Sequence, residues 1–447
     1  MDKFDCVVIE LKVWDIRFPT SMGHHGSDAM HGEVDYSAAY VTLKTDSSDG
    51  IIGHGLTFTL GKGTDIVVKA IEVIRPRILG RNIKDVFQGF GKFWQEIVRD
   101  GQLRWLGPEK GVVHIAASAV FNALWDLWAK KENKPVWKLL ADMSPEQILS
   151  LVDFSYITDA ISKEEALEIL KKNEATKQER EKILLEKGYP AYTTSVAWLG
   201  YSDEYLTKLC KEALEEGWTK FKVKVGASLE DDIRRCRIIR EKIGPDMEMM
   251  VDANQRWDVK DAIEWMKNLT QFKLKWIEEP TSPDDVQGHR VIAEAMEPYG
   301  IGVATGECCQ NRVMFKQFIR DGKIKYCQID SCRLGSINEN IAVLLMAKKY
   351  GVSVCPHAGG VGLCELVQHI IMFDYLCVSG TTEDRVCEYV DHLHEHFVDP
   401  VVIKNAAYTA PKDPGFSSEM KTESISDYEY PTGAVWQKLL KEGKFTL

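Results

Sequence analysis

The sequence predicts an α/β protein in which a barrel of βα units follows an N-terminal segment of mixed strands and helices. From about residue 148 to about 400, short apolar runs alternate with amphipathic helices, the pattern of parallel βα units. Ionisable side chains recur near the ends of these runs. The chain has 447 residues, which leaves room for a barrel of roughly 250 residues and a further domain.

The first domain is predicted over residues 1–147. VVIELKVWDIRF and AAYVTLKT alternate apolar and polar residues and are expected to be strands, separated by the Gly-rich polar loop GHHGSDAMHGEVD. Residues 64–142 have a helical pattern, with small residues facing aromatic ones.

The barrel is predicted over residues 148–410, and its first apolar runs are VDFSY and AYTTSVAW. A highly charged segment, 162–187, interrupts the alternation and is interpreted as a solvated helical insertion. After residue 410 the sequence is punctuated by Pro and Gly, and we expect 411–447 to return over the first domain.

Composition narrows the possible functions. Apolar residues make up 45% of the chain and charged residues 28%, values typical of a folded globular protein. The formal net charge of −11 argues against a nucleic-acid partner and against an anionic membrane surface. The most apolar long stretch, 361–378, contains three ionisable residues, so it is not expected to span a membrane.

Eleven cysteines are present, and no C-x-x-C pair occurs. This favours buried free thiols in a reducing compartment over a structural zinc site. The first residues, MDKFDCVVIELKV, resemble a strand and show neither a signal peptide nor a transit peptide.

The chemistry is indicated by the side chains at the ends of the apolar runs. One ionisable group lies near the end of each successive run, at intervals of 23 to 31 residues. In a βα barrel these strand ends meet around one mouth, where active sites lie. Burying unpaired charges is costly, so a purely structural origin of the whole series is disfavoured. The residues are Lys224, Asp252, Glu278, Glu307, Asp330, His357 and Glu388.

Asp252, Glu278 and Glu307 are expected to end three consecutive strands and therefore to converge. Clustered carboxylates repel unless a cation lies between them, and oxygen ligands with room for water and substrate suit Mg²⁺. Asn254 should face the same side as Asp252 and orient a ligand or the substrate. Glu279 should point the other way, into a pair on the helix side.

Lys222 and Lys224 should both point into the barrel because side chains alternate along a strand. We expect each to lower the pKa of the other, which would make Lys224 a base near neutral pH. Across the mouth, Asp330 would accept a hydrogen bond from His357 and fix its tautomer. Lys224 and His357 would then face the two sides of a carbon next to a metal-bound carboxylate.

This arrangement defines a reaction class. Mg²⁺ on the carboxylate stabilises the enediolate that forms when the α-proton leaves. If the next carbon carries a hydroxyl, His357 as imidazolium can protonate it, and dehydration gives a 2-keto acid. The same residues could instead racemise or epimerise the α-carbon. A non-catalytic regulator or RNA-binding protein is a third possibility, which the acidic charge and the complete set of catalytic groups oppose.

The motifs resemble those of the enolase superfamily, mandelate-racemase subgroup, which carries K-x-K, D-x-N, E-E-P, G-E and an Asp–His dyad on successive strands. The corresponding residues here are KVK (222–224), DAN (252–254), EEP (278–280), GE (306–307), and Asp330 with His357. Longer segments, including DGQLRWLGPEKGVVH, DANQRWD, QIDSCRLG and CPHAGGVGLCELVQH, resemble the L-fuconate dehydratases of that subgroup. The likeness covers nearly the whole chain.

The resemblance implies a modified TIM barrel, (β/α)7β, under an α+β capping domain. It implies a Mg²⁺-dependent hydro-lyase that converts L-fuconate into 2-dehydro-3-deoxy-L-fuconate and water, in a homo-oligomer located in mitochondria or the cytoplasm. It further implies that the loop GHHGSDAMH closes on an acid-sugar substrate. The implied substrate contacts are Gly26, Ser27, Asp28, Tyr36, Lys222, Asn254, Glu307, His357 and Glu388.

Overall fold

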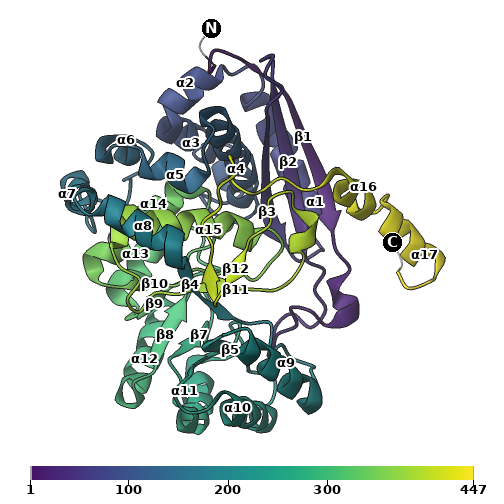
Figure 1. The fold of residues 1–447 in the computed structure, drawn as a ribbon, viewed down its shortest axis with the longest axis vertical. Helices are drawn as coiled ribbons and strands as arrows, with labels where there is room; N and C mark the ends of the chain where they lie inside the picture. The colour runs from purple at the N-terminus through teal and green to yellow at the C-terminus, as the bar shows by residue number, and fades with distance from the viewer. Residues whose placement is uncertain (1–2, 446–447) are drawn as a thin grey trace.

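An antiparallel sheet of three strands opens the chain in the computed structural model, which describes residues 3–445 (Figure 1). The outermost residues of the first and last predicted segments lie outside the described range. The strands are paired in the order β1-β2-β3. They are β1 (Val8–Arg17), β2 (Ser37–Thr45) and β3 (Ile52–Thr59).

The helix α4 (Gly111–Glu132) packs closely against this sheet. A side chain at Gly55 of β3 would lie 2.3 Å from the backbone nitrogen of Ala123, so only glycine allows the two backbones to approach this closely. Among the described residues, α4 is the one helix long and apolar enough to cross a membrane by length and composition. Because 83% of its apolar stretch is buried, α4 serves as the core helix of the first domain.

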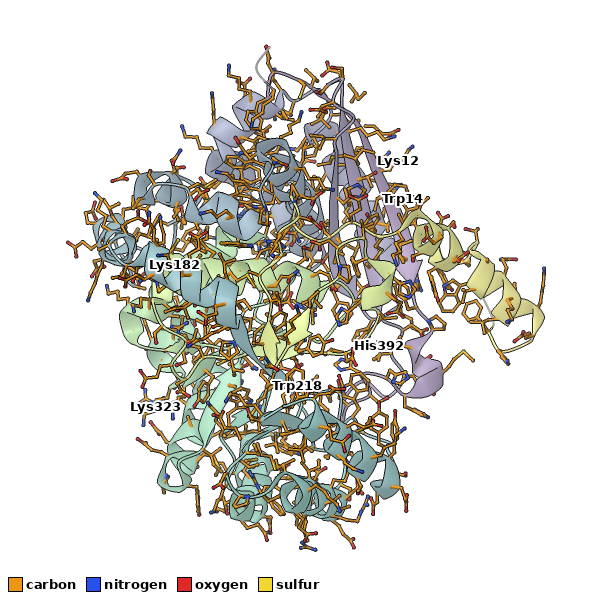
Figure 2. The ribbon with its side chains drawn as sticks, in the orientation of Figure 1. Lys12, Trp14, Lys182, Trp218, Lys323 and His392 are labelled. Atoms are coloured by element: carbon orange, nitrogen blue, oxygen red, sulfur yellow. The ribbon has the colours of Figure 1, made fainter. Side chains whose placement is uncertain are left out.

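Shorter helices surround α4 and complete the N-terminal layer (Figure 1). They are α1 (Thr64–Ile74), α2 (Ile83–Gln88), α3 (Phe90–Val98), α5 (Val136–Ala141) and α6 (Pro145–Ser150). The charged segment forms α7 (Lys163–Glu174) and α8 (Lys177–Lys187). Lys182 lies on the exposed side of α8 (Figure 2), whereas Arg180 is buried and donates to the carbonyls of Asn173 and Leu376.

The predicted barrel is confirmed as (β/α)7β. Neighbouring strands are parallel, β11 pairs with β4, and the backbone nitrogen of Glu388 donates to the carbonyl of Pro356 at 3.1 Å, which closes the ring. Its strands are β4 (Tyr189–Thr193), β5 (Lys220–Lys224), β6 (Glu248–Asp252), β7 (Trp276–Glu278), β8 (Gly302–Thr305), β9 (Tyr326–Cys327), β10 (Ser353–Val354) and β11 (Cys387–Tyr389). The helices between them are α9 (Asp203–Glu215), α10 (Leu229–Ile243), α11 (Val259–Leu269), α12 (Val286–Met296), α13 (Arg312–Asp321), α14 (Ile337–Tyr350) and α15 (Leu363–Phe373).

A layer of apolar side chains closes the barrel interior below the mouth. The layer consists of Tyr192, Met250, Trp276, Ala304, Tyr326, Cys355 and Val386. Side chains two residues further along a strand return to the same face. The step from Met250 to Asp252, from Trp276 to Glu278 and from Cys355 to His357 therefore places charged groups on top of this apolar floor.

The last part of the chain runs from the barrel to the first sheet. β12 (Ile403–Lys404) pairs with β13 (Ala407–Tyr408), which adds antiparallel to β4 of the barrel. The helices α16 (Thr422–Tyr428) and α17 (Ala434–Lys441) follow, and α17 projects from the body in Figure 1. The indole nitrogen of Trp436 donates to the carbonyl of Arg17 at 3.0 Å, and the Arg17 guanidinium stacks 3.7 Å from the centre of the Tyr430 ring. These contacts tie the chain end to β1.

One predicted strand is wrong. The run VDFSY, residues 152–156, forms a turn-rich linker between the N-terminal helices and the barrel. Val152 and Phe154 are buried, and Asp153 accepts a hydrogen bond from Arg312 at 2.9 Å. The run is apolar because packing of the linker requires it, and it pairs with no strand among the described residues.

The free energy of unfolding is expected to fall between pH 6.5 and about 9. Burial lowers the pKa of His394, but Glu365, 2.6 Å away, outweighs it and raises the pKa from 6.5 to about 9. The folded state therefore holds this proton more tightly, and the stabilisation is complete below pH 6.5 and lost as the pH rises through about 9. Over this pH range, chemical denaturation should show that the free energy of unfolding falls by roughly 1–3 kcal/mol more in the wild-type protein than in Glu365→Gln. Parallel pH curves for the two proteins would contradict this assignment.

Candidate active site

A cavity of about 450 Å³ opens at the carboxyl ends of the barrel strands, a volume in the range of small-molecule sites. The N-terminal domain covers one side of it through the loop around Gly26 and Tyr36 and through Phe58 at the end of β3. Lys224, Asn254, Glu307, Asp330, His357 and Glu388 line its barrel side. Most of the residues predicted from the strand ends thus meet in one cavity.

Three carboxylates converge at the base of the cavity. Asp252 ends β6, Glu278 ends the neighbouring strand β7, and Glu307 is the second residue after β8. Each of the three offers an oxygen within 4.8 Å of the others. Asp252 and Glu278 are fully buried. Burial and the repulsion of Asp252 raise the pKa of Glu278 to about 8. The cluster therefore holds more negative charge than its surroundings neutralise.

Two lysines from β5 lie beside these acids. Lys222 is fully buried, with its Nζ 2.6 Å from Glu278 and 2.7 Å from Glu388. The Nζ of Lys224 lies 2.5 Å from Asp252 and 3.0 Å from the amide oxygen of Asn254. With Glu307, these groups carry four negative charges against two positive ones when ionised.

The predicted lowering of the Lys224 pKa is wrong for this arrangement of side chains. Burial and the neighbouring Lys222 do lower the pKa, as expected. The Asp252 carboxylate, with smaller contributions from Glu307 and Asp28, outweighs them and raises the pKa of Lys224 above its ordinary value. The sequence shows that two lysines are adjacent, but the position of the compensating acid requires the fold.

His357 and Asp330 form the predicted dyad. The Nδ1 of His357 lies 2.7 Å from Oδ2 of Asp330, and β9 and β10 are adjacent parallel strands. The other ring nitrogen lies 3.7 Å from Glu307 and 3.8 Å from Glu388. Burial lowers the pKa of His357, but these carboxylates outweigh it and raise the pKa to about 9. These carboxylates therefore favour the imidazolium form, which can donate a proton.

Lys224 and His357 lie on nearly opposite sides of the mouth. In the closed barrel, β11 and β4 separate β10 from β5 on one side, and β6 to β9, which include the strands that lead to the three carboxylates, separate them on the other. Glu388, on β11, lies between them and accepts a hydrogen bond from the backbone nitrogen of Ala358. A small molecule above the carboxylates would have an ammonium on one face and an imidazolium on the other.

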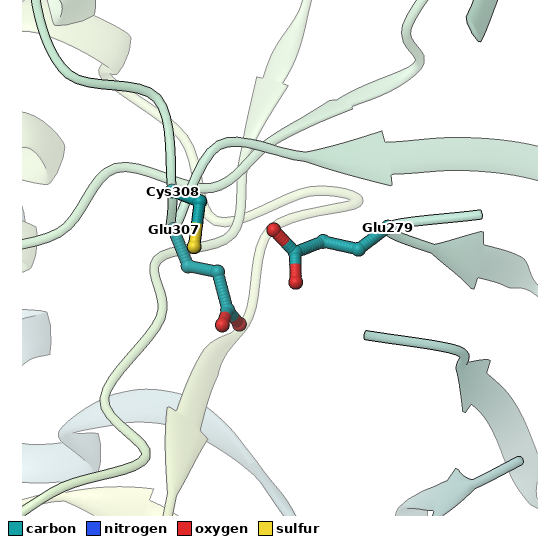
Figure 3. A group of neighbouring side chains, drawn as sticks. All are labelled: Glu279, Glu307 and Cys308. Carbon is teal, nitrogen blue, oxygen red and sulfur yellow. The ribbon is translucent and has the colours of Figure 1, made fainter. Parts of the chain in front are cut away.

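Glu279 departs from the prediction. It has a positive φ of 44°, which is rare for a residue with a Cβ and turns the side chain back toward the mouth. Figure 3 shows its carboxylate facing Glu307 and Cys308. One oxygen accepts from the Gln255 side chain at 2.9 Å, and burial raises the pKa of Glu279 well above its ordinary range.

The cap loop contributes a subset of the predicted contacts. Gly26, Asp28 and Tyr36 line the cavity, and Gly26 has a φ of 83° with the Tyr36 ring so close that a side chain would clash. Ser27 does not line the cavity. Its hydroxyl donates to the carbonyl of Gly32 at 3.0 Å, and its own carbonyl accepts from Leu199, so it anchors the loop to the barrel.

Other lining residues were not predicted from the sequence. Cys308 is the one cysteine that is not buried, and all eleven are free, as predicted. His31 pairs with Asp28 at 3.0 Å, and Trp198 lies after β4. Arg333 comes three residues after Asp330 and lines the cavity. Position after a strand end was the available signal for Trp198 and Arg333, but residue type alone did not separate them from ordinary loop residues.

Shortening the loop 26–31 should raise the KM for substrate at least 10-fold and leave the thermal midpoint nearly unchanged. The loop closes over the cavity but lies outside the barrel, and it is held to the barrel by the hydrogen bond from the backbone nitrogen of Leu199 to Ser27 and by the contact of Arg256 with the Met30 sulfur. Steady-state kinetics and calorimetric melting of the same preparation measure both quantities. A fall in the thermal midpoint that accounts for the loss of activity would show that the loop is structural.

Family models match both parts of the chain. Residues 8–141 match the mandelate racemase / muconate lactonizing enzyme N-terminal domain, and residues 205–424 match the enolase C-terminal domain-like model. The chain is 63% identical to mitochondrial enolase superfamily member 1 of Xenopus laevis, over 97% of this chain and 98% of that protein. The crystal structure of the human protein of that name superposes with a TM-score of 0.97, at 61% identity, covering 98% of this chain and 100% of that one.

More distant relatives carry names of specific activities. An L-galactonate dehydratase of Hypocrea jecorina is 55% identical over 94% of each chain. A racemase of Streptomyces coelicolor, solved with bound magnesium, superposes with a TM-score of 0.73 at 25% identity, over 94% of this chain and 99% of that one. Together with the two matching domain models, these similarities establish that the chain belongs to the mandelate-racemase subgroup of the enolase superfamily.

Proposed function

We propose that the protein is a Mg²⁺-dependent acid-sugar dehydratase, and that its substrate is L-fuconate. The observation that carries the proposal is the placement of Lys224 and the His357–Asp330 dyad on opposite sides of three converging carboxylates. An ammonium and an imidazolium on the two faces of one carbon can remove a proton and protonate a leaving group. A relative at 55% identity is named a dehydratase, which supports dehydration over racemisation as the reaction.

The carboxylate cluster fits Mg²⁺. Its donors are oxygens only, as this hard cation prefers, and they come within 4.8 Å of one another. Six ionised groups, four acids and two lysines, leave a net charge of −2, which one divalent cation balances. Asp252, Glu278 and Glu307 would hold the ion. When bound, Mg²⁺ supplies positive charge that stabilises a substrate carboxylate as its α-proton is removed.

Lys224 is assigned the removal of the C2 proton. With a cation held by Asp252, less of that carboxylate's charge would act on Lys224, and burial and Lys222 would favour the neutral amine. His357 is assigned the protonation of the departing C3 hydroxyl, since Asp330 and Glu388 keep its imidazolium form. Asn254 can orient the substrate carboxylate with its amide nitrogen, whereas the ionised Glu388 can accept a hydrogen bond from a substrate hydroxyl.

An apolar wall in the cavity supports a substrate with a terminal methyl group. The wall lies on the N-terminal-domain side, opposite the charged barrel side. A 6-deoxy acid sugar can place its reacting carboxylate among the charged groups and its methyl group against this wall. The wall includes Val34, Phe58, Leu60, Val67 and Ile115.

A screen of acid sugars with Mg²⁺, scored for 2-keto acid formation, tests the proposal. L-Fuconate should give 2-dehydro-3-deoxy-L-fuconate with a higher kcat/KM than L-galactonate, which carries a hydroxyl in place of the apolar terminus. Formation of a stereoisomer without a 2-keto acid would assign the site to a racemase or epimerase instead. Retention of the protein by nucleic acid in a salt-sensitive manner, with no turnover, would favour a non-catalytic role.

Glu278→Gln is expected to weaken Mg²⁺ binding by about 10- to 100-fold, because it removes one of the three ionised ligands. Titration calorimetry with the wild-type protein and the variant measures the affinity directly. A crystal grown with Mg²⁺ should place the ion about 2.0–2.2 Å from oxygens of Asp252, Glu278 and Glu307. An ion bound elsewhere, with these oxygens uncoordinated, would refute the assignment.

The name of the animal relatives supports a mitochondrial location for this protein. Fractionation of the source cells, with the 2-keto acid product as the activity marker, tests that part of the proposal. Activity confined to the cytosolic fraction would contradict it.

A further inference from the structure

Among the described residues, two cations of the cavity wall, Arg333 and Lys62, have roles that neither the predicted motifs nor the proposed mechanism explains, and Arg333 is the one on the barrel side. It lies on the loop after β9, next to the loop that carries His357. Its side chain is exposed within the cavity that it lines. Among residues 3–445, no hydrogen bond or ion pair holds its guanidinium, although a guanidinium offers five donors.

The backbone of this loop, in contrast, is held firmly. The Oδ1 atom of Asp330 accepts from the backbone nitrogens of both Cys332 and Arg333 at 2.7 Å, while its other oxygen holds His357. The turn that carries Arg333 is therefore fixed by the same carboxylate that orients the imidazole.

The cap helix α4 clamps the next two residues of the loop. His114 contacts the carbonyl of Leu334 at 2.7 Å, and the hydroxyl of Ser118 donates to the carbonyl of Gly335 at 2.7 Å. Both contacts are buried. A loop fixed on both sides that carries a charged side chain without a protein partner has the form of a preorganised ligand-binding group.

The charges around Arg333 favour a neutral acceptor over a further anion. Glu307 and Asp330 line the same cavity. Burial lowers the pKa of Arg333, but the Cys308 thiol, Asp330, Glu307 and the buried Glu279 outweigh it and raise the pKa. The guanidinium is thus already balanced by acids. A substrate hydroxyl can accept its hydrogen bonds without adding negative charge to this part of the cavity.

We propose that Arg333 is a substrate-binding residue that donates hydrogen bonds to a hydroxyl of the acid sugar beyond C3, and that it thereby selects sugars carrying that hydroxyl. The inference rests on the proposed function, because His357 must serve C3 for Arg333 to face the more distant carbons. A charged donor that loses its acceptor inside a cavity discriminates strongly against the deoxy analogue.

The test compares L-fuconate with its 4-deoxy and 5-deoxy analogues, using wild-type protein, Arg333→Met, Arg333→Lys and Arg237→Met, all with Mg²⁺. Arg237 is the control: it is exposed on α10 and does not line the cavity. Binding is measured by calorimetry and turnover by 2-keto acid formation. Arg333→Met should weaken L-fuconate binding and kcat/KM by about 10- to 100-fold, Arg333→Lys should restore part of the loss, and Arg237→Met should match the wild type.

The decisive result is non-additivity. The wild-type protein should bind one of the two deoxy analogues about 10- to 100-fold more weakly than L-fuconate. Arg333→Met should bind that analogue and L-fuconate equally. Equal losses for all substrates, or no loss at all, would overturn the inference. The inference would also be overturned if the protein bound no acid sugar. It would likewise be overturned if the wild-type protein, but not Arg333→Met, preferred a sugar with a second, distal carboxylate. If acid sugars bind but no 2-keto acid forms, the proposed function fails, while the binding comparison still decides the role of Arg333.

Discussion

His357→Asn should lower the rate of dehydration by about 10²- to 10⁴-fold, because no other group on its side of the cavity can protonate the departing hydroxyl. Asparagine keeps a polar side chain of similar reach next to Asp330, so the fold of the two loops should survive. Exchange of the C2 proton with deuterated solvent should persist in part, since Lys224 remains. Proton NMR in D₂O measures exchange and product formation in one sample.

The partial loss is what identifies the role. A variant that loses both exchange and dehydration, with an unchanged thermal midpoint, would make His357 the base that removes the C2 proton. A variant that keeps full dehydratase activity would remove His357 from the mechanism altogether. The dyad geometry, with Nδ1 held 2.7 Å from Asp330, would then be structural.

Lys224→Ala should abolish both the exchange of the C2 proton and the dehydration that depends on it. This loss is more complete than that of His357→Asn because the first step, removal of the C2 proton, fails. Lys220→Ala is the matched control, since Lys220 lies on the same strand four residues earlier and pairs with Glu248 at 3.1 Å, away from the mouth. The control should retain wild-type exchange.

Folding must be checked in the Lys224 variant because Asp252 loses a buried partner. Circular dichroism and the melting transition, both recorded with Mg²⁺, separate a chemical from a structural loss. If Lys224→Ala kept exchange while His357→Asn lost it, the two roles would be reversed. If both variants kept full activity, the assignment of the site would be wrong.

The barrel and the positions of its acids could be predicted because two periodicities coincide in the sequence. Side chains alternate along each strand, and strand ends recur once per βα unit, so Asp252, Glu278 and His357 had to rise above the apolar floor formed by Met250, Trp276 and Cys355. Neither periodicity depends on details of packing. The fold class could be predicted from the same alternation.

Features set by local backbone geometry could not be predicted in this way. Glu279 is turned toward the mouth by a φ of 44°, which breaks the alternation on which its predicted direction depended. Ser27 lies among loop residues that contact the cavity, but its hydroxyl is satisfied by Gly32 instead. The run 152–156 is apolar because it is buried as a linker, and burial alone does not distinguish a linker from a strand.

Electrostatic balance was the second limit. The proximity of Lys222 and Lys224 in sequence predicts mutual lowering of their pKa values, but the outcome depends on where Asp252 and Glu388 lie in three dimensions. Arg333 is a second example of a charge whose surroundings the sequence does not show. Its position after a strand end is visible in the sequence, but the absence of a protein partner for its guanidinium within residues 3–445 is visible only in the structure.

The most direct test of the central claim is proton NMR of the wild-type protein with L-fuconate and Mg²⁺ in D₂O. The account predicts loss of the C2 proton signal, formation of 2-dehydro-3-deoxy-L-fuconate with deuterium from solvent at C3, and no reaction after chelation of the metal. Unchanged L-fuconate after prolonged incubation, with neither exchange at C2 nor a 2-keto acid product, would contradict it.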